Sequence, residues 1–246
     1  MVRLSNPSRR NAVSVGMWRA LAAFSAEVSA RSDIYSVVLR GEGERAFSAG
    51  ADITDFADHR NASDPHYYDD LVETTCRAIE AIPQPVVAMI YGACLGAGSS
   101  LAASCDLRLA ASDAFFAVPA GRLGLGYDPR GVKRFVRTFG GPATTTLLYT
   151  AGRIGAERAH QLGGVHEIAP AEDLEATAEA ILGRIEANAP LTLRAAKLAL
   201  RAVRPESDPA LFGQAVDAVL AADRSDDYVE GRAAFAERRP PRFVGA

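Results

Sequence analysis

The sequence is poor in the residues that build metal centres and disulfide frameworks. It has three cysteines and four histidines in 246 residues. Cys76, Cys94 and Cys105 form no C-x-x-C pair and lie in no cluster of histidine and cysteine with metal-ligand spacing. An odd number of isolated cysteines is typical of buried free thiols. We therefore expect neither a metal site nor a disulfide.

A strong net charge and long apolar runs are also missing. The net charge of -3, with a pI near 5.9, gives no electrostatic reason to expect nucleic acid as a partner. No apolar run approaches the ~20 residues that span a bilayer, and residues 1–7 lack the apolar core of a signal peptide. We expect a cytoplasmic protein with no membrane partner.

Short apolar strands alternate with amphipathic helices over residues 1–187. Helices are predicted over 15–30, with Ser14 as the N-cap, and over 68–82, where prolines end the helix. This alternation predicts an α/β fold. The predicted strands cover residues 36–40, 85–90, 107–111 and 165–168.

The predicted strands stop after residue 187. Residues 188–246 are interpreted as helices separated by prolines, with apolar faces that have little core of their own to bury. Such a region packs on the main domain or on another subunit. We interpret it as an oligomerisation region.

Two glycine-containing loops each lie where a buried strand ends and a helix begins. Residues 46–53 read A-F-S-A-G-A-D-I, and residues 91–98 read Y-G-A-C-L-G-A-G. The first N–H groups of a helix have no intrahelical partner and carry the positive end of its dipole. Two such loops can aim two N–H groups at one ligand oxygen, an oxyanion hole that favours thioester chemistry. Ordinary turns, or a phosphate site at Gly-x-Gly, are the alternatives.

Four separated segments, in order and spacing, resemble the enoyl-CoA hydratase/isomerase (crotonase) superfamily. They are A-F-S-A-G-A-D-I, Q-P-V-V-A-M-I-Y-G-A-C-L-G-A-G, C-D-L-R-L-A-A-S-D-A-F-F and R-I-G-A-E-R-A-H-Q-L-G-G-V-H. The closing E-G-R-A-A-F-A-E-R-R-P-P-R-F is also similar to that family. The resemblance covers nearly the whole chain. Of the family's opening β-hairpin only the strand over residues 2–4 remains, so we expect either an exposed sheet edge or a late start codon.

The resemblance implies a crotonase-like spiral of ββα units over residues 1–187 and a helical trimerisation region over 188–246. It also implies acyl-CoA thioesters as ligands, with coenzyme A part of the substrate and no permanently bound cofactor. Homotrimers or dimers of trimers are the expected assembly.

Family positions place the oxyanion donors on the backbone N–H groups of Ala51 and Ala97. The two glutamates that hydratases of the family use fall on Ser100 and Ala120, and neither of these residues can act as a carboxylate base. Positioned acid–base groups each contribute roughly 10²–10⁴-fold. We therefore do not expect an efficient hydratase.

Asp128 is the leading catalytic candidate, because it aligns with the nucleophilic aspartate of the family's 4-chlorobenzoyl-CoA dehalogenase. The dehalogenase's aromatic pocket is not reproduced, so dehalogenation itself is disfavoured. An equal alternative is that Asp128, before Pro129, caps a helix. Tyr127 and Arg130 are candidates to orient the substrate or are surface turn residues.

Three further acyl-pocket candidates complete the set. Glu73 faces either the acyl pocket or solvent, Ser100 could hold a water or hydrogen-bond a substrate oxygen, and Ala120 occupies a pocket position. The four histidines match no base position of the family.

The resemblance assigns coenzyme A binding to an early turn, the first glycine loop and the closing segment. Arg238 would suit a phosphate, although it could also belong to a solvated basic end. The matching positions are Arg10, Ala12, Ala49, Ala51, Asp52, Ile53, Phe235 and Arg238.

Two classes of function follow. The first is an enzyme that stabilises a thioester enolate and moves a proton with one carboxylate, isomerisation fitting better than hydrolysis or decarboxylation. The second is a non-catalytic acyl-CoA binding or carrier protein.

Overall fold

The computed structural model describes residues 1–54, 66–205 and 207–246. Contacts within the chain divide it into two compact units. The first unit comprises Met1–Glu27, Val38–Ile82 and Val86–Ala178, and the second comprises Val28–Val37, Pro83–Pro85 and Glu179–Ala246. The predicted division after residue 187 stays a prediction.

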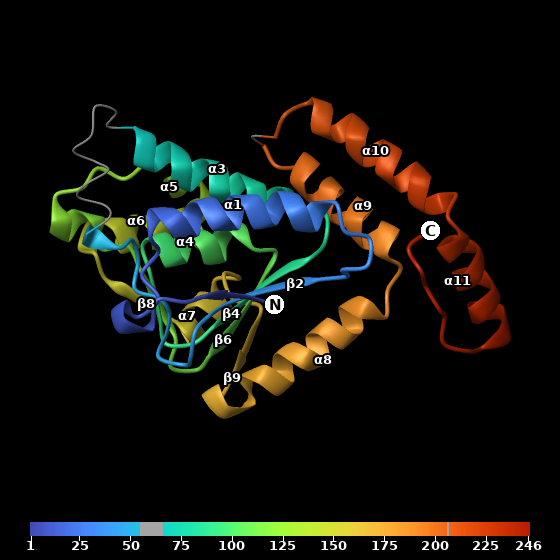
Figure 1. Ribbon diagram of the computed structural model, residues 1–246, viewed down its shortest axis with the longest axis horizontal. Coiled ribbons are helices and arrows are strands. Elements are labelled where there is room, and N and C mark those ends of the chain that lie inside the picture. Colours follow the sequence, from blue (N-terminus) through green and yellow to red (C-terminus); the bar gives the residue numbers. More distant parts are fainter. Residues whose placement is uncertain (55–65, 206) are drawn as a thin grey trace. The chain divides into compact units, whose positions relative to one another are not determined.

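The structure contains a five-stranded sheet with the strand order β1-β2-β4-β6-β9 (Figure 1). The registers of β1 on β2, β4 on β6 and β6 on β9 are all parallel. Every residue of β2 and β4 is buried, as expected of parallel strands covered on both faces. The predicted strands are confirmed as β1 (Val2–Leu4), β2 (Val37–Gly41), β4 (Val86–Ile90), β6 (Leu107–Ala111) and β9 (Glu167–Ala169).

A second sheet has four strands of three residues each, in the order β3-β5-β7-β8. These strands are β3 (Ala46–Ser48), β5 (Ala93–Leu95), β7 (Phe115–Ala117) and β8 (Arg153–Gly155). Chain order then gives repeated units of one strand in each sheet followed by a helix, for example β4, β5 and α4 (Ala97–Ser104). The predicted α/β spiral of ββα units is confirmed.

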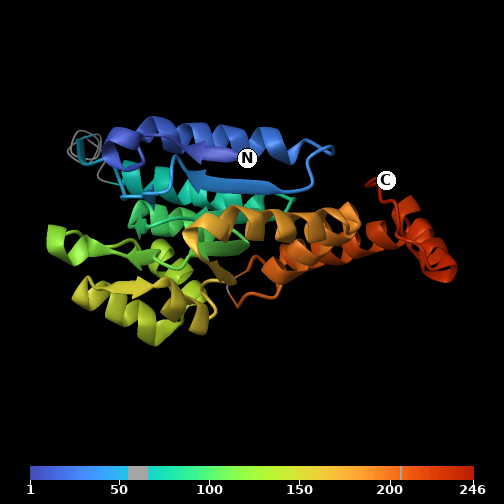
Figure 2. The same ribbon diagram turned by 90° about the horizontal axis from the view of Figure 1, so that it is seen from below.

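Helices α1 (Val15–Ser29) and α3 (Tyr67–Ala81) lie side by side (Figures 1 and 2). Ser14 Oγ accepts a hydrogen bond from the N–H of Met17 at 3.2 Å, which confirms the predicted N-cap of α1. The fully buried Trp18 of α1 donates from Nε1 to the hydroxyl of Tyr68 on α3 at 3.1 Å. Helix α3 ends before Pro83, as the sequence predicts.

The other helices follow the same chain order. Short 3₁₀ helices cover Pro7–Arg9, Pro119–Leu123 and Ala171–Asp173. The α-helices are α5 (Pro129–Phe139), α6 (Gly141–Thr150), α7 (Ala156–Gln161), α8 (Leu174–Glu186), α9 (Pro190–Ala202), α10 (Ala210–Asp223) and α11 (Asp226–Glu237). In the described part of the chain, no helix is both long and apolar enough to cross a membrane.

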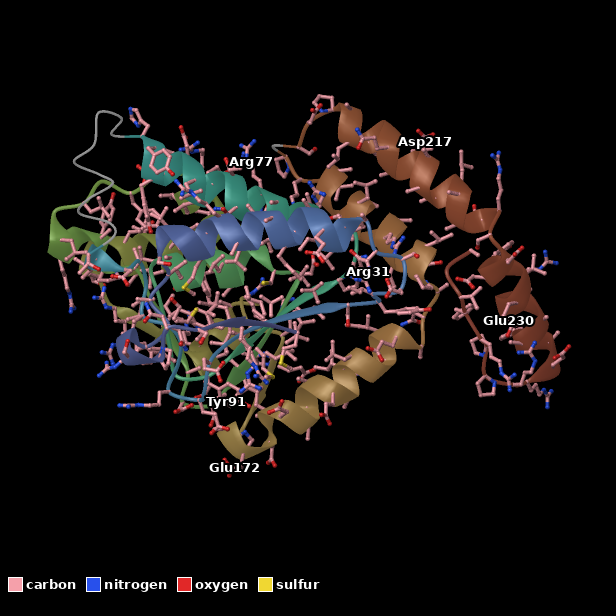
Figure 3. The ribbon with its side chains drawn as sticks, in the orientation of Figure 1. Arg31, Arg77, Tyr91, Glu172, Asp217 and Glu230 are labelled. Atoms are coloured by element: carbon pink, nitrogen blue, oxygen red, sulfur yellow. The ribbon has the colours of Figure 1, made fainter. Side chains whose placement is uncertain are left out.

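The second unit is built mainly from α9, α10 and α11. Helices α9 and α10 pack along each other and leave an apolar hollow of about 220 Å³ between them. The chain after α11 folds back on that helix, where the Asp227 carboxylate accepts hydrogen bonds from the N–H groups of Val244 and Gly245 at 2.7 and 2.9 Å. Glu230, labelled on α11 in Figure 3, binds the guanidinium of Arg239.

Candidate active site

The first unit contains a cavity of about 380 Å³ with mainly apolar walls. Both glycine loops line it, together with α3, the first turn of α4, residues 118–128 and the start of α5. Of the residues predicted for this site, the cavity lining contains Ala49, Ala51, Ile53, Glu73, Ala97, Ser100, Ala120, Tyr127 and Asp128.

The two glycine loops meet at Gly50 and Gly96. These residues have φ values of +107° and +44°, in the region that favours glycine. A Cβ atom on Gly96 would lie 3.9 Å from the Cα of Gly50, so the two backbones are nearly in contact. The residues that follow, Ala51 and Ala97, consequently line one cavity.

The N–H groups of Ala51 and Ala97 donate to no group among the described residues. Their neighbours are held firmly: the N–H of Asp52 donates to the carbonyl of Val13 at 3.0 Å, and the N–H of Gly96 donates to the carbonyl of Ala117 at 2.8 Å. Ala97 is also the first residue of α4, where the helix dipole favours negative charge. The arrangement therefore leaves two unused donors beside one cavity.

Asp128 is the N-cap of α5, as one of the two interpretations predicts. Its Oδ1 accepts from the N–H of Arg130 at 2.7 Å, and its Oδ2 accepts from the Nε of Arg130 at 2.8 Å. The hydrogen bonds from Arg130 hold the pKa of Asp128 below its usual range. Asp128 is thus an ionised carboxylate on the cavity wall, and its catalytic role stays a prediction.

Ser100 and Tyr127 form a hydrogen-bonded pair of hydroxyl groups, with 3.0 Å between Oγ and Oη. Burial raises the pKa of the Tyr127 phenol, so this hydroxyl stays protonated. The Tyr127 ring also packs over Phe135, with 5.7 Å between ring centroids. Tyr127 is therefore fixed in the cavity wall, and the surface-turn alternative is wrong for this residue.

Glu73 is buried on α3, so the solvated alternative is wrong for this carboxylate. Its Oε1 accepts from the Nε of Arg77, labelled in Figure 3, at 2.7 Å, and its Oε2 accepts from Arg134 at 2.9 Å. Arg134 also donates to Glu80 at 2.9 Å. Two arginines thus hold Glu73 as a charged part of the cavity wall.

Sequence reasoning missed Arg134 as a residue of the site. It lies in the run K-R-F-V-R of α5, which is typical of an exposed basic helix face. The structure buries its side chain to 4 % exposure because it bridges Glu73 and Glu80 from α3. The signal available in the sequence was the position of Arg134 beside the apolar Phe135, which the structure shows to be fully buried. Arg130, which was predicted, binds Asp128 and Asp70 and does not itself line the cavity.

The early turn and the first glycine loop come together as the resemblance implies. The carbonyl of Arg10 accepts from the N–H of Ala49 at 2.9 Å, and Ala12 is buried beside this contact. The Asp52 carboxylate is bound by Arg9 and accepts from the hydroxyl of Thr54 at 2.8 Å. The predicted roles of these residues toward coenzyme A stay predictions.

The remaining predicted residues belong to other parts of the chain. Phe235 is 87 % exposed on α11, and Arg238 ends that helix in a left-handed conformation; both lie in the second unit.

Three of the histidines do not line the cavity, and His59 lies outside the described residues. The predicted burial of all three thiols is confirmed. The described residues contain no cluster suited to a metal ion.

Comparison with known proteins gives consistent matches along the chain. A family model described as enoyl-CoA hydratase/isomerase matches residues 1–246. The putative enoyl-CoA hydratase/isomerase YngF of Bacillus subtilis is 33% identical over 247 residues, covering 100% of this chain and 94% of that protein. The short-chain-enoyl-CoA hydratase of Clostridium acetobutylicum is 31% identical over 242 residues, covering 97% and 91%.

Solved structures of enoyl-CoA hydratase family members are also similar to this chain. An enoyl-CoA hydratase/carnithine racemase from Magnetospirillum magneticum has a TM-score of 0.91 and 33% identity, covering 99% of this chain and 91% of its own. Relatives named for other reactions also match: the methylmalonyl-CoA decarboxylase of Escherichia coli is 32% identical over 220 residues, covering 87% of this chain and 83% of that protein. The similarity therefore spans more than one reaction.

Proposed function

Because the chain belongs to the enoyl-CoA hydratase/isomerase family, we propose that it binds an acyl-CoA thioester and stabilises the enolate formed from it. The observation that carries this proposal is the pair of unused N–H groups at Ala51 and Ala97 beside one cavity. A thioester carbonyl placed there accepts both hydrogen bonds. Each such donor is worth about 2.7–4 kcal/mol when charge develops on the oxygen.

The proposed chemistry is a double-bond isomerisation that uses a single carboxylate. The Asp128 carboxylate takes a proton from the acyl chain, and the electrons of the broken C–H bond move to the thioester oxygen. The same proton then returns to a different carbon as the enolate collapses. One base is sufficient, which suits a cavity in which Ser100 and Ala120 occupy the other acid–base positions.

Hydration is not proposed, because it requires activation of a water and delivery of a proton by separate groups. Glu73, a second carboxylate of the cavity wall, is held by two arginines. Hydrolysis or decarboxylation of a functionalised acyl-CoA is the nearest enzymatic alternative, since either uses the same carbonyl-polarising donors.

Replacement of Ala97 tests the oxyanion donor directly. Proline is well accepted at the first position of a helix and has no N–H, so Ala97→Pro removes the donor while fitting α4. We expect kcat on the best enoyl-CoA substrate to fall by about 10²–10³-fold. The matched control Ala97→Gly keeps the N–H and should stay within a few-fold of the wild type. Equal activity of the proline and glycine variants would refute the proposed donor.

A second candidate is a non-catalytic acyl-CoA binding protein. It is favoured by the fact that both oxygens of Asp128 are engaged by Arg130. A panel of 2-enoyl-, 3-enoyl- and β-ketoacyl-CoA thioesters separates the candidates, with binding measured by calorimetry and turnover by chromatography. Substrate-like affinity without turnover of any member would select the binding protein.

The assembly proposed with this function is a homotrimer or a dimer of trimers. Its support is the apolar surface of α9 and α10, where Leu200, Val203 and Phe212 are each more than half exposed. Exposed apolar residues gathered on two packed helices are typical of an interface between subunits.

A further inference from the structure

The mainly apolar cavity wall contains a pair of hydroxyl groups that the proposed proton transfer does not use. Ser100 and Tyr127 bind each other at 3.0 Å, and the same cavity is lined by Leu95, Val118 and Leu125. A pair of hydroxyls in an apolar wall is costly to bury unless its hydrogen bonds are used. Its donors and acceptors therefore indicate what ligand the cavity takes.

The pair has one donor left over. Two hydroxyls carry two O–H groups, and their mutual hydrogen bond uses one of them. Among the described residues, neither side-chain oxygen has a further hydrogen-bond partner. The phenol is neutral because burial raises the pKa of Tyr127, so no negative charge is available to repel an acceptor. One O–H group is thus free to donate to a ligand.

The position of this donor along the ligand follows from α4. Ser100 lies three residues after Ala97, about 4.5 Å farther along the helix axis and on the same face. We place the thioester oxygen on the N–H of Ala97, with the acyl chain running along α4 toward Ser100. The free donor therefore falls near C3 of the acyl group, two bonds from the thioester carbon.

The adjoining wall also has a surplus of donors. Arg134 lines the cavity, is only 4 % exposed, and its Nη1 has no partner among the described residues. Around it, two carboxylates bind three guanidinium groups. These groups belong to Glu73, Arg77, Glu80, Arg134 and Arg137.

Two carboxylates of the same wall are already engaged. The oxygens of Asp128 and Glu73 already accept hydrogen bonds from arginines. A ligand oxygen that only accepts matches this wall better than a hydroxyl, which brings a donor of its own.

We propose that the cavity selects acyl-CoA thioesters with a carbonyl-type oxygen on C3, either a β-ketone or the carboxylate of a malonyl-type group, and that Ser100 and Tyr127 are the specificity-determining residues. This inference rests on the proposed thioester site. A ligand of this kind has no carbon–carbon double bond to move, so it directs the site to hydrolysis or decarboxylation of a functionalised acyl-CoA rather than to isomerisation. The ketone and the carboxylate share the acceptor oxygen that a free O–H group binds.

Calorimetric dissociation constants of four matched thioesters test the proposal: acetoacetyl-CoA, malonyl-CoA, 3-hydroxybutyryl-CoA and butyryl-CoA. We expect acetoacetyl-CoA or malonyl-CoA to bind about tenfold more tightly than butyryl-CoA, the value of one well-placed hydrogen bond, with 3-hydroxybutyryl-CoA between them. Tighter binding of acetoacetyl-CoA would identify the neutral ketone as the preferred acceptor, and tighter binding of malonyl-CoA would identify the charged carboxylate. Tyr127→Phe, Ser100→Ala and the double variant should bring the ratio toward one.

The matched control is Tyr149→Phe, which changes an 88 % exposed tyrosine away from the cavity and should keep the wild-type ratio. Equal affinity of the wild type for all four thioesters would overturn this inference and leave the thioester site standing. An unchanged ratio of dissociation constants in the double variant would also overturn this inference and leave the thioester site standing. Failure of every thioester to bind would overturn the proposed function as well.

Discussion

At the scale of single residues, Asp128 combines two tasks that a substitution can separate. Its Oδ1 caps α5 through the N–H of Arg130, and its charge is held by the guanidinium of the same arginine. The lowered pKa keeps the carboxylate ionised at neutral pH but also makes it a weaker base. A cap requires only an oxygen acceptor, whereas proton transfer requires the charge.

We therefore expect Asp128→Asn to keep most of the stability and lose the activity. The asparagine oxygen can still cap α5, whereas Asp128→Ala should lower the free energy of unfolding by about 1 kcal/mol. Both variants should reduce kcat by about 10²-fold or more. Urea unfolding followed by the fluorescence of the single tryptophan, buried Trp18, gives the stability. Wild-type turnover in the asparagine variant would show that Asp128 only caps α5 and has no catalytic role.

At the scale of elements, the contact of α4 with β3 positions the predicted oxyanion donors. A Cβ atom on Gly98 would lie 2.7 Å from the Cβ of Ser48, so α4 approaches this strand more closely than any larger residue allows. Ser48 lies two residues before Gly50, and Gly98 directly follows Ala97. The closeness of helix and strand therefore brings the two loops together.

Gly98→Ala should push α4 away from β3. We expect a loss of roughly 1–3 kcal/mol in the free energy of unfolding, the usual range for overpacking, together with weaker binding of the thioester. The matched control is Gly213→Ala on α10, where an added Cβ meets nothing within 4 Å and helix propensity favours alanine. Equal stability of the two variants would show that the contact at Gly98 is not a tight one.

At the scale of the whole molecule, the apolar surface of α9 and α10 predicts self-association. Phe212 and Val216 are 61% and 46% exposed beside the hollow between these helices. Sedimentation equilibrium should give a mass of three or six chains of 26.0 kDa. Phe212→Glu combined with Val216→Glu should dissociate the assembly, because burying a carboxylate without a partner is unfavourable.

The control for this surface lies on the same helix. Asp217, labelled on α10 in Figure 3, is already polar, so Asp217→Asn should leave the mass unchanged. A single-chain mass for the wild type would contradict the predicted assembly, and an unchanged mass for the double variant would place the interface elsewhere.

The sequence by itself determined the order of buried strands and helices and the cap at Ser14. It also determined the end of α3 before Pro83 and the two glycine loops of the site. Each of these follows from residues near in sequence, through apolar periodicity, capping and the restrictions of proline and glycine. The three-residue strands of the second sheet carry too short a pattern to show alternation, so they were foreseen only through the family resemblance.

Only the tertiary structure decided the state of the charged residues in the site. Glu73 and Arg134 are 61 positions apart, and their ion pair forms because α3 and α5 pack together. This pairing buries a carboxylate that an exposed helix would leave in water, and it brings an unexpected arginine into the cavity wall. The hydrogen bond between Ser100 and Tyr127 likewise joins residues 27 positions apart. Local patterns do not encode such contacts, because they depend on how distant elements pack.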